Sequence, residues 1–238
     1  MQDQVEMLSK HIDFLKSLDT EEFYNKDEDE VRRLAHNTIQ ELIQLGTHAT
    51  NDLIELLRTE FTWSCFFALT IFRQTRDPQV VPALIAFLKR ESDDSMANEE
   101  AMFALQDIGD SSIVPLIEDL EDAFDNKKYN SYLIGALTGI IEPVPYDFMI
   151  KITKDFIRKP WQYKGWFHIE DFTYNFVKQE RKDAIPLLKQ ILEMKGITGE
   201  EKRGLEDTLR ALEDPESYEK EIEETANELS EAVNQDIS

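Results

Sequence analysis

The stretch DPQVVPALIAFLKRESDDSMANEEAMFALQDIGDSSIVPLIEDLED, residues 77–122, decides the fold. Its apolar residues recur at intervals of three and four, which is the period of an amphipathic helix, and strand-like alternation is almost absent. Asp77 stands before Pro78, a pair typical of a helix N-terminus, and GDSS at 109–112 breaks the pattern again. We therefore expect short helices joined by tight turns, and an all-α protein.

The second helix of this stretch recurs along the chain. PALIAFLKR (82–90) is similar to PLIEDLED (115–122) and PLLKQILE (186–193), and each proline is expected near a helix start. One apolar residue of each copy serves as an anchor: Leu53, Leu84, Leu116, Phe148 and Leu187. The spacings between these anchors are 31, 32, 32 and 39 residues. A helical hairpin of that period cannot bury its apolar face alone, so we expect stacked hairpins with one continuous core.

These residues also carry a family resemblance. The order Asp-Pro, Val-Pro-x-Leu-Ile, Ala-x-x-Ala-Leu-x-x-Ile-Gly-Asp and again Val-Pro in 77–122 resembles the HEAT-like repeats of the phycobilisome-lyase type. The pattern is specific over these 46 residues and looser over 30–76 and 123–195. The resemblance implies an α-solenoid that binds proteins through a concave face. It does not imply lyase chemistry.

The expected fold is thus an α-solenoid of about five HEAT-like helical hairpins with helical caps. We expect a capping helix and acidic linker at 1–29, the repeat array at 30–213, and an acidic helix and tail at 214–238. The first array helix carries a clear apolar stripe, made of Val31, Leu34, Ala35, Thr38, Ile39, Leu42 and Ile43. The C-terminal helix either caps the array or docks a partner or second copy through Tyr218, Ile222, Ala226, Leu229 and Val233.

Composition narrows the classes of function. The formal net charge of −23 argues against broad non-specific binding to nucleic acid, where lysine and arginine neutralise phosphates, and it attracts basic partners. No run of eighteen apolar residues exists, so we expect no membrane-spanning helix, and MQDQVEMLSKHIDF does not have the pattern of a signal peptide. Cys65 is the only cysteine, and a cytoplasmic location is the simplest expectation.

Charge and aromatic residues are unevenly spread. Residues 1–122 carry 26 acidic and 10 basic side chains, whereas residues 123–195 carry 9 acidic and 12 basic ones. The same basic segment holds 13 of the 24 aromatic residues. Within it, RKPWQYKGWFHIEDF (158–172) combines the two features. The basic, aromatic part of the chain therefore differs in chemistry from the acidic helices before it.

This aromatic segment has two interpretations. The last anchor spacing exceeds the period by about seven residues, and Pro160 and Gly165 predict a loop at 158–166. One interpretation is a recognition loop, in which the partner-binding residues are Lys159, Trp161, Tyr163, Lys164 and Trp166. The other is that the rings, together with Phe167, Phe172 and Phe176, fill the core of the fifth repeat. Both can hold, because tryptophan is often half buried.

The acidic helices offer a second candidate surface. A solvated face of turn and helix residues is the simplest interpretation, and an acidic face that attracts a basic protein is the functional one. The residues of this candidate face are Glu91, Asp93, Asp94, Glu99, Glu118, Asp119, Glu121 and Asp122.

The sequence predicts no catalytic residue, no metal site and no cofactor. His11, His36, His48 and His168 are isolated, and no phosphate-binding or nucleophile-elbow motif is present. Cys65 lies among aromatic residues in FTWSCFFAL, which favours a buried inert thiol over a nucleophile.

We therefore expect a non-catalytic scaffold or adaptor that binds a basic protein on the surface of the solenoid. Two alternatives remain. The first is an enzyme subunit similar to a phycobilin lyase, and the second is a nucleic-acid binder that stacks bases on the rings of 158–166. Partner identity and oligomeric state do not follow from the sequence.

Overall fold

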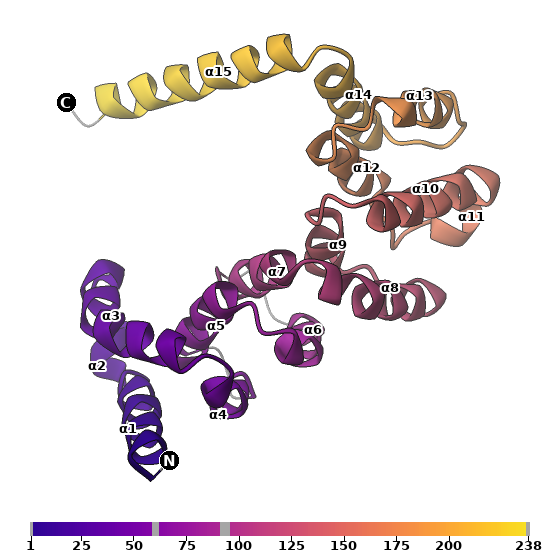
Figure 1. Cartoon of the computed structure of the whole chain (residues 1–238). Coiled ribbons are helices and arrows are strands. Elements are labelled where there is room, and N and C mark those ends of the chain that lie inside the picture. Colours follow the sequence, from indigo (N-terminus) through magenta and orange to yellow (C-terminus); the bar gives the residue numbers. More distant parts are fainter. Residues whose placement is uncertain (1, 59–61, 91–95, 237–238) are drawn as a thin grey trace. The chain divides into compact units, whose positions relative to one another are not determined.

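The computed structural model of the chain describes residues 2–58, 62–90 and 96–236, which contain helices and no strand (Figure 1). The prediction of an all-α protein is confirmed. The chain forms two compact units, one of residues 1–122 and 132–140 and the other of residues 123–131 and 141–238. None of the described helices combines the length and the apolar character that a membrane crossing requires.

The first unit holds the N-terminal helices. Its elements are α1 (Gln2–Ser17), α2 (Glu21–Tyr24), α3 (Glu28–Leu45), η1 (Gly46–Ala49), α4 (Thr50–Leu56), α5 (Trp63–Thr75), η2 (Pro78–Val80), α6 (Val81–Leu88), α7 (Met96–Ile108), most of α8 (Asp110–Asp125) and most of α9 (Ser131–Thr138). Helix α5 packs against α1, α3, α4 and α7, and it is buried on nearly every side. Helix α5 is therefore the centre of this unit.

Short polar side chains fix where these helices begin. Asp27 accepts a hydrogen bond from the backbone N–H of Asp29 at the start of α3. The buried carboxylate of Asp77 accepts from the N–H of Gln79 at 3.0 Å and from the hydroxyl of Thr50 at 2.5 Å. The predicted N-cap at Asp77 is thus confirmed, and it also ties the start of η2 to the start of α4.

The apolar stripes pack largely as predicted. Val31, Ala35, Ile39 and Leu42 of α3 are buried, but Leu34 is 48% exposed, against the prediction. Leu34 lies at the border of the stripe, where the packed face of the helix ends.

The second unit contains the aromatic segment. Its elements after the last turn of α8 are α10 (Pro143–Arg158), α11 (Pro160–Tyr163), α12 (Ile169–Lys178), η3 (Lys182–Ala184), α13 (Ile185–Leu192), α14 (Gly199–Glu213) and α15 (Pro215–Asp236). Helix α12 packs on α14, and α13 packs on both α10 and α14. This arrangement places the end of α10, all of α11 and the start of α14 in one unit with the aromatic rings.

The repeated prolines differ in their places. Pro82 and Pro186 lie in the first turns of α6 and α13, as predicted, each after a short 3₁₀ turn. Pro115 lies inside α8. The residues before it continue the α-helix, whereas the residues before Pro82 and Pro186 form a separate 3₁₀ turn. In the last copy the buried residue is Leu188, and the predicted anchor Leu187 is half buried.

The C-terminal residues form a helix, as expected. Tyr218 of α15 lies beneath the guanidinium of Arg210 of α14, at 5.9 Å from the ring centroid. Ile222 is 50% exposed and Ala226 is exposed. The side chains of Leu229 and Val233 lie outside the described residues. In the described part of the expected stripe, Tyr218 is therefore packed against Arg210, whereas Ile222 and Ala226 are exposed to solvent.

Candidate functional site

The aromatic segment forms a one-turn helix and a tight turn between α10 and α12. Pro160 occupies the first turn of α11, where its missing N–H leaves no hydrogen bond broken. Gly165 has a φ of +83°, a conformation that suits glycine, and it turns the chain back so that Phe167 N donates to Tyr163 O at 3.2 Å. The loop predicted from Pro160 and Gly165 is thus present, with one helical turn inside it.

Tyr163 anchors this loop to α10. Its side chain is only 7% exposed, and its hydroxyl donates to Asp155 Oδ2 at 3.0 Å. Burial raises the pKa of Tyr163, with the hydrogen bond to Asp155 acting in the same direction. The pKa of Asp155 is lowered, chiefly by the hydrogen bond from Arg158, and Lys159 Nζ lies 3.3 Å from the same carboxylate. Tyr163 and Lys159 therefore hold the loop in place.

The rings behind the loop form a packed cluster. The Trp166 indole stacks on Tyr163 with ring centroids 5.5 Å apart and planes 18° apart, and its N–H donates to Gln162 O at 2.8 Å. Phe167 lies edge-on to Tyr163 at 5.1 Å and to Phe124 at 5.6 Å. Phe167, Phe172 and Phe176 are buried, as the core interpretation predicts.

Trp161 is placed differently from the other rings. Its side chain is 69% exposed, the largest exposed fraction among the described aromatic side chains. It lies on the rim of a pocket of about 610 Å³. The two interpretations of the segment are thus divided between its residues. Tyr163 and Phe167 belong to the core, Trp166 is half buried, and Trp161 faces solvent.

The opposite wall of this pocket comes from the connection between α13 and α14. We call the whole site the aromatic pocket; it is lined by Phe156, Pro160, Trp161, Tyr163, Lys164, Gly165, Trp166, Phe167, His168, Glu170, Met194, Lys195, Gly196, Ile197, Thr198, Glu200 and Glu201. A capping box fixes the wall, because Thr198 Oγ1 accepts from Glu201 N at 3.1 Å and Glu201 Oε2 accepts from Thr198 N at 2.6 Å.

Close packing of α14 on α12 positions that wall. A Cβ added to Gly204 would lie 2.7 Å from Glu170 Cβ, so the two helices approach more closely than a larger residue would allow. This contact brings the first turn of α14 toward the rings. Glu200 and Glu201 in that turn consequently share the pocket with Trp161.

Sequence reasoning did not find this wall. The pattern Thr198–Gly–Glu–Glu201 has the spacing of a capping box and marks a helix start, but nothing in it places that start beside Trp161. Lys164 is exposed and lines the pocket, whereas Lys159 is paired with Asp155. To the two lysines and Glu170 that the segment itself contains, the structure adds Lys195, Glu200 and Glu201.

The residues of the expected acidic face have different surroundings. Glu99, Glu118, Glu121 and Asp122 are exposed. Asp119 is half buried and accepts from Lys89 Nζ at 2.6 Å, so it links α8 to α6. Glu91, Asp93 and Asp94 lie outside the described residues. The described members of this face belong to the first unit, and the aromatic pocket belongs to the second.

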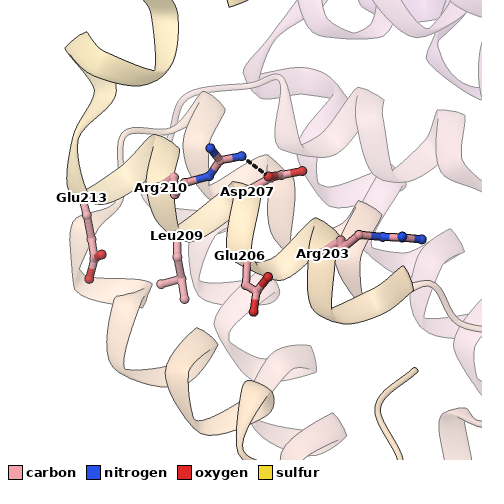
Figure 2. Close-up of a pocket in the computed structure, with 6 residues that line it drawn as sticks. All are labelled: Arg203, Glu206, Asp207, Leu209, Arg210 and Glu213. Atoms are coloured by element: carbon pink, nitrogen blue, oxygen red, sulfur yellow. Dashed lines mark hydrogen bonds and ion pairs between the residues drawn. The ribbon is translucent and has the colours of Figure 1, made fainter. Parts of the chain in front are cut away.

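A second hollow, of about 560 Å³, lies along α14 and is lined mainly by charged side chains (Figure 2). Its lining residues are Arg203, Glu206, Asp207, Leu209, Arg210 and Glu213, all carried by one helix. Arg210 donates hydrogen bonds to Asp207 and to Glu221. Figure 2 draws the contact with Asp207 as a dashed line. Asp207 and Arg210 pair with each other, and Glu213 pairs with Lys189 of α13, at 2.6 Å. This hollow lies on the surface of a single helix and has no aromatic side chain in its lining, so the aromatic pocket is the better candidate site.

Cys65 and the possible metal ligands are the remaining chemically reactive groups that the sequence analysis considered. Cys65 is buried, and burial raises its pKa to about 12, which confirms the prediction of a buried thiol. In the described ranges 2–58, 62–90 and 96–236, no group of three or more histidine, cysteine, aspartate or glutamate side chains is placed to hold a metal ion.

The chain was compared with models of protein families, with curated proteins and with solved structures, and none of the three comparisons gave a match.

Proposed function

We propose that the protein is a non-catalytic helical-repeat protein that binds a segment of a protein partner in the aromatic pocket. Trp161 carries this proposal. A mostly exposed indole at the rim of a pocket of about 610 Å³ leaves a large rigid apolar surface in water. Tryptophan in such a position is typical of an interface hot spot, because its ring buries much area at little cost in conformational entropy.

The surroundings of Trp161 support binding by a preformed surface. Tyr163 is held by Asp155, Trp166 is stacked on Tyr163, and the capping box at Thr198 fixes the facing wall. A partner would therefore meet rings and charges that are already in position. Preorganisation of this kind reduces the entropic cost of binding.

The proposed architecture is the HEAT-like α-solenoid that the resemblance implies. Three features of the separate units support it. In the first unit α5 packs on both α3 and α7, so that alternate helices of the chain are neighbours. In the second unit α12 packs on α14 in the same way. The recurrence of a short 3₁₀ turn before α4, α6 and α13 fits a repeated hairpin.

We further propose that the partner is basic and that the protein is cytoplasmic. The net charge of −23 and the exposed carboxylates of Glu99, Glu118 and Glu121 would attract a cationic protein and raise the rate of encounter. The single buried cysteine, Cys65, is compatible with a reducing compartment.

Peptide selection tests this proposal. A library of random peptides displayed on phage is selected on the full chain and then measured against Trp161→Ala and Ile141→Ala. Ile141 is a matched control, because it is exposed and lies in the same unit outside the pocket lining. We expect a convergent set of peptides whose affinity falls at least tenfold with Trp161→Ala and is unchanged with Ile141→Ala, since a hot-spot tryptophan contributes about 2 kcal/mol or more. Peptides that fail to converge, or that bind both variants equally, contradict the proposal.

A further inference from the structure

We propose that the aromatic pocket receives a cationic side chain of the partner, an arginine guanidinium, which lies on the Trp161 indole and pairs with Glu200. This inference rests on the proposed protein-binding function and specifies its ligand. It concerns the chemistry of the group that enters the pocket.

The first observation is the way this protein covers its own rings. Arg32 lies over Phe66 at 4.5 Å, and Arg90 lies over Phe87 at 4.8 Å. The same arrangement recurs in the pairs Lys26–Phe23, Arg73–Phe103, Arg181–Tyr146 and Arg210–Tyr218. A cation thus covers both buried rings, such as Phe66 and Tyr146, and partly exposed ones, such as Phe103. Within the part of the chain that the structure describes, no lysine or arginine lies over Trp161 or Trp166. Tryptophan is the most favourable ring for a cation–π contact, so the exposed indole of Trp161 can receive a cation from a partner.

The second observation is the charge of the pocket lining. Glu200 and Glu201 of the facing wall and Glu170 of α12 line the pocket, together with Lys164 and Lys195. Glu201 Oε2 accepts from Thr198 N, and Glu170 Oε1 lies 3.8 Å from His168 Nδ1. Glu200 is exposed and takes no part in the capping box, so its carboxylate is the one placed to pair with an incoming cation.

An anionic or a purely apolar group suits this lining less well. The face of an aromatic ring carries partial negative charge, so a carboxylate in the pocket would meet both the rings and three glutamates. The two lysines at 158–166 do not by themselves select an acidic ligand. Lys159 is paired with Asp155, and three glutamates line the pocket beside Lys164 and Lys195.

Arginine fits better than lysine for two physical reasons. Its guanidinium is planar, so it can stack on the indole while its edge donates two hydrogen bonds to one carboxylate. It is also more weakly hydrated than an ammonium, so less free energy is lost when it leaves water. A pocket of about 610 Å³ has room for the whole side chain and part of the neighbouring backbone.

The test uses the indole N–H signals of the full chain labelled with ¹⁵N-tryptophan. Its three tryptophans, Trp63, Trp161 and Trp166, give three signals, which are assigned from the Trp→Phe variants. The probes are three blocked tripeptides, acetyl-Gly-Arg-Gly-amide, acetyl-Gly-Glu-Gly-amide and acetyl-Gly-Leu-Gly-amide, which differ only in the central side chain. Trp63 lies in the first unit and is the internal reference.

We expect the arginine probe to shift the Trp161 signal in a saturable way while the Trp63 signal stays in place. Glu200→Gln should weaken this binding about three- to tenfold, as loss of one charged partner predicts. Glu99→Gln, which removes an exposed carboxylate of the first unit, should leave it unchanged. Glu200→Gln should leave the urea unfolding midpoint unchanged, which separates lost binding from lost folding.

Three outcomes overturn the inference. They are a stronger response to the glutamate or leucine probe, equal effects of Glu200→Gln and Glu99→Gln, and no saturable shift of Trp161 with any probe. The protein-binding proposal is tested separately by the peptide selection. Selected peptides that depend on Trp161 but need no arginine would support protein binding and would contradict the arginine inference. A selection that yields no Trp161-dependent peptide rejects the binding proposal itself.

Discussion

The carboxylate of Asp19 accepts two hydrogen bonds from Ser64, one from the backbone N–H at 2.8 Å and one from the hydroxyl at 2.5 Å. Asp19 follows the end of α1, and Ser64 lies in the first turn of α5, 45 residues later. The contact joins the N-terminal helix to the most buried helix of the first unit. It also satisfies a backbone donor that the start of α5 would otherwise leave without a partner.

Replacing Asp19 by alanine should therefore destabilise the first unit. The change removes both hydrogen bonds, and we expect a loss of about 1–2 kcal/mol in the free energy of unfolding, measured by urea denaturation. Thr62 still caps α5 through its own hydroxyl, so the helix itself should persist. Asp13→Ala, at an exposed position of α1, is the control and should change stability little. Equal stabilities of the two variants would show that the contact contributes nothing.

Arg73 should stabilise the packing of α5 on α7. Its guanidinium bonds to Glu100 at 3.1 Å and Asp107 at 3.1 Å and lies 4.9 Å from the centre of the Phe103 ring. We expect Arg73→Ala to cost about 1 kcal/mol, because the pairs are partly exposed but act as a network. The cost should shrink in high salt. Arg33→Ala, at an exposed position of α3, is the matched control. A salt-independent loss would point to packing of the side-chain stem instead of charge.

The close approach of α14 to α12 can be tested by replacing two glycines of α14 in turn. Gly204→Ala should destabilise the second unit by about 1–3 kcal/mol, because the new Cβ would overlap Glu170. Gly199→Ala meets no atom within 4 Å and should be neutral or slightly stabilising, since alanine favours helix. Thermal unfolding of both variants measures the difference. If Gly204→Ala stabilises as Gly199→Ala does, the two helices are not in the contact that forms the pocket wall.

Asp183 gives a prediction about pH. Arg181 donates to both oxygens of Asp183, at 3.1 and 3.2 Å, and this contact, with a further hydrogen bond from Tyr146, lowers the pKa of Asp183 to about 2. An unpaired aspartate titrates near pH 4, so the folded chain binds the proton less tightly than the unfolded chain. The contribution of this group to stability is thus present above about pH 4 and is lost as the pH falls toward about 2.

Carboxyl NMR checks that prediction directly. The Asp183 signal should titrate near pH 2 in the unmutated chain and closer to pH 4 in Arg181→Gln. Asp52, an exposed aspartate of α4, serves as a reference signal in both proteins. An ordinary Asp183 pKa in the unmutated chain contradicts the observed contact.

The sequence predicts most of the local structure, because helix starts and breaks depend on neighbouring residues. Asp77 caps a helix through an atom two residues away, and Val81, Leu84, Ile85 and Leu88 of the apolar stripe in 81–88 are all buried. Pro115 was expected in a first turn and lies inside α8. Inside α8 Pro115 has no N–H to donate to the carbonyl four residues earlier, and the Val-Pro pair alone does not show that the helix begins before it.

Less of the aromatic pocket can be predicted from the sequence. The residue types of 158–166 indicate a binding loop, but which ring is exposed depends on contacts with Asp155 and Phe124, which lie outside that segment. The facing wall depends on a missing Cβ at Gly204, 38 residues after Trp166. Only the packing of α12 on α14 shows that these parts meet, and the sequence carries no local signal for it.

Acrylamide quenching of tryptophan fluorescence, with and without a peptide selected on the full chain, is the decisive measurement of partner binding at Trp161. We expect a freely quenched, red-emitting component that disappears in Trp161→Phe. We also expect the peptide to protect this component, because the partner covers the exposed indole. If Trp161 resists quenching in the free protein, or stays equally accessible when the peptide is bound, the aromatic pocket is not the binding site.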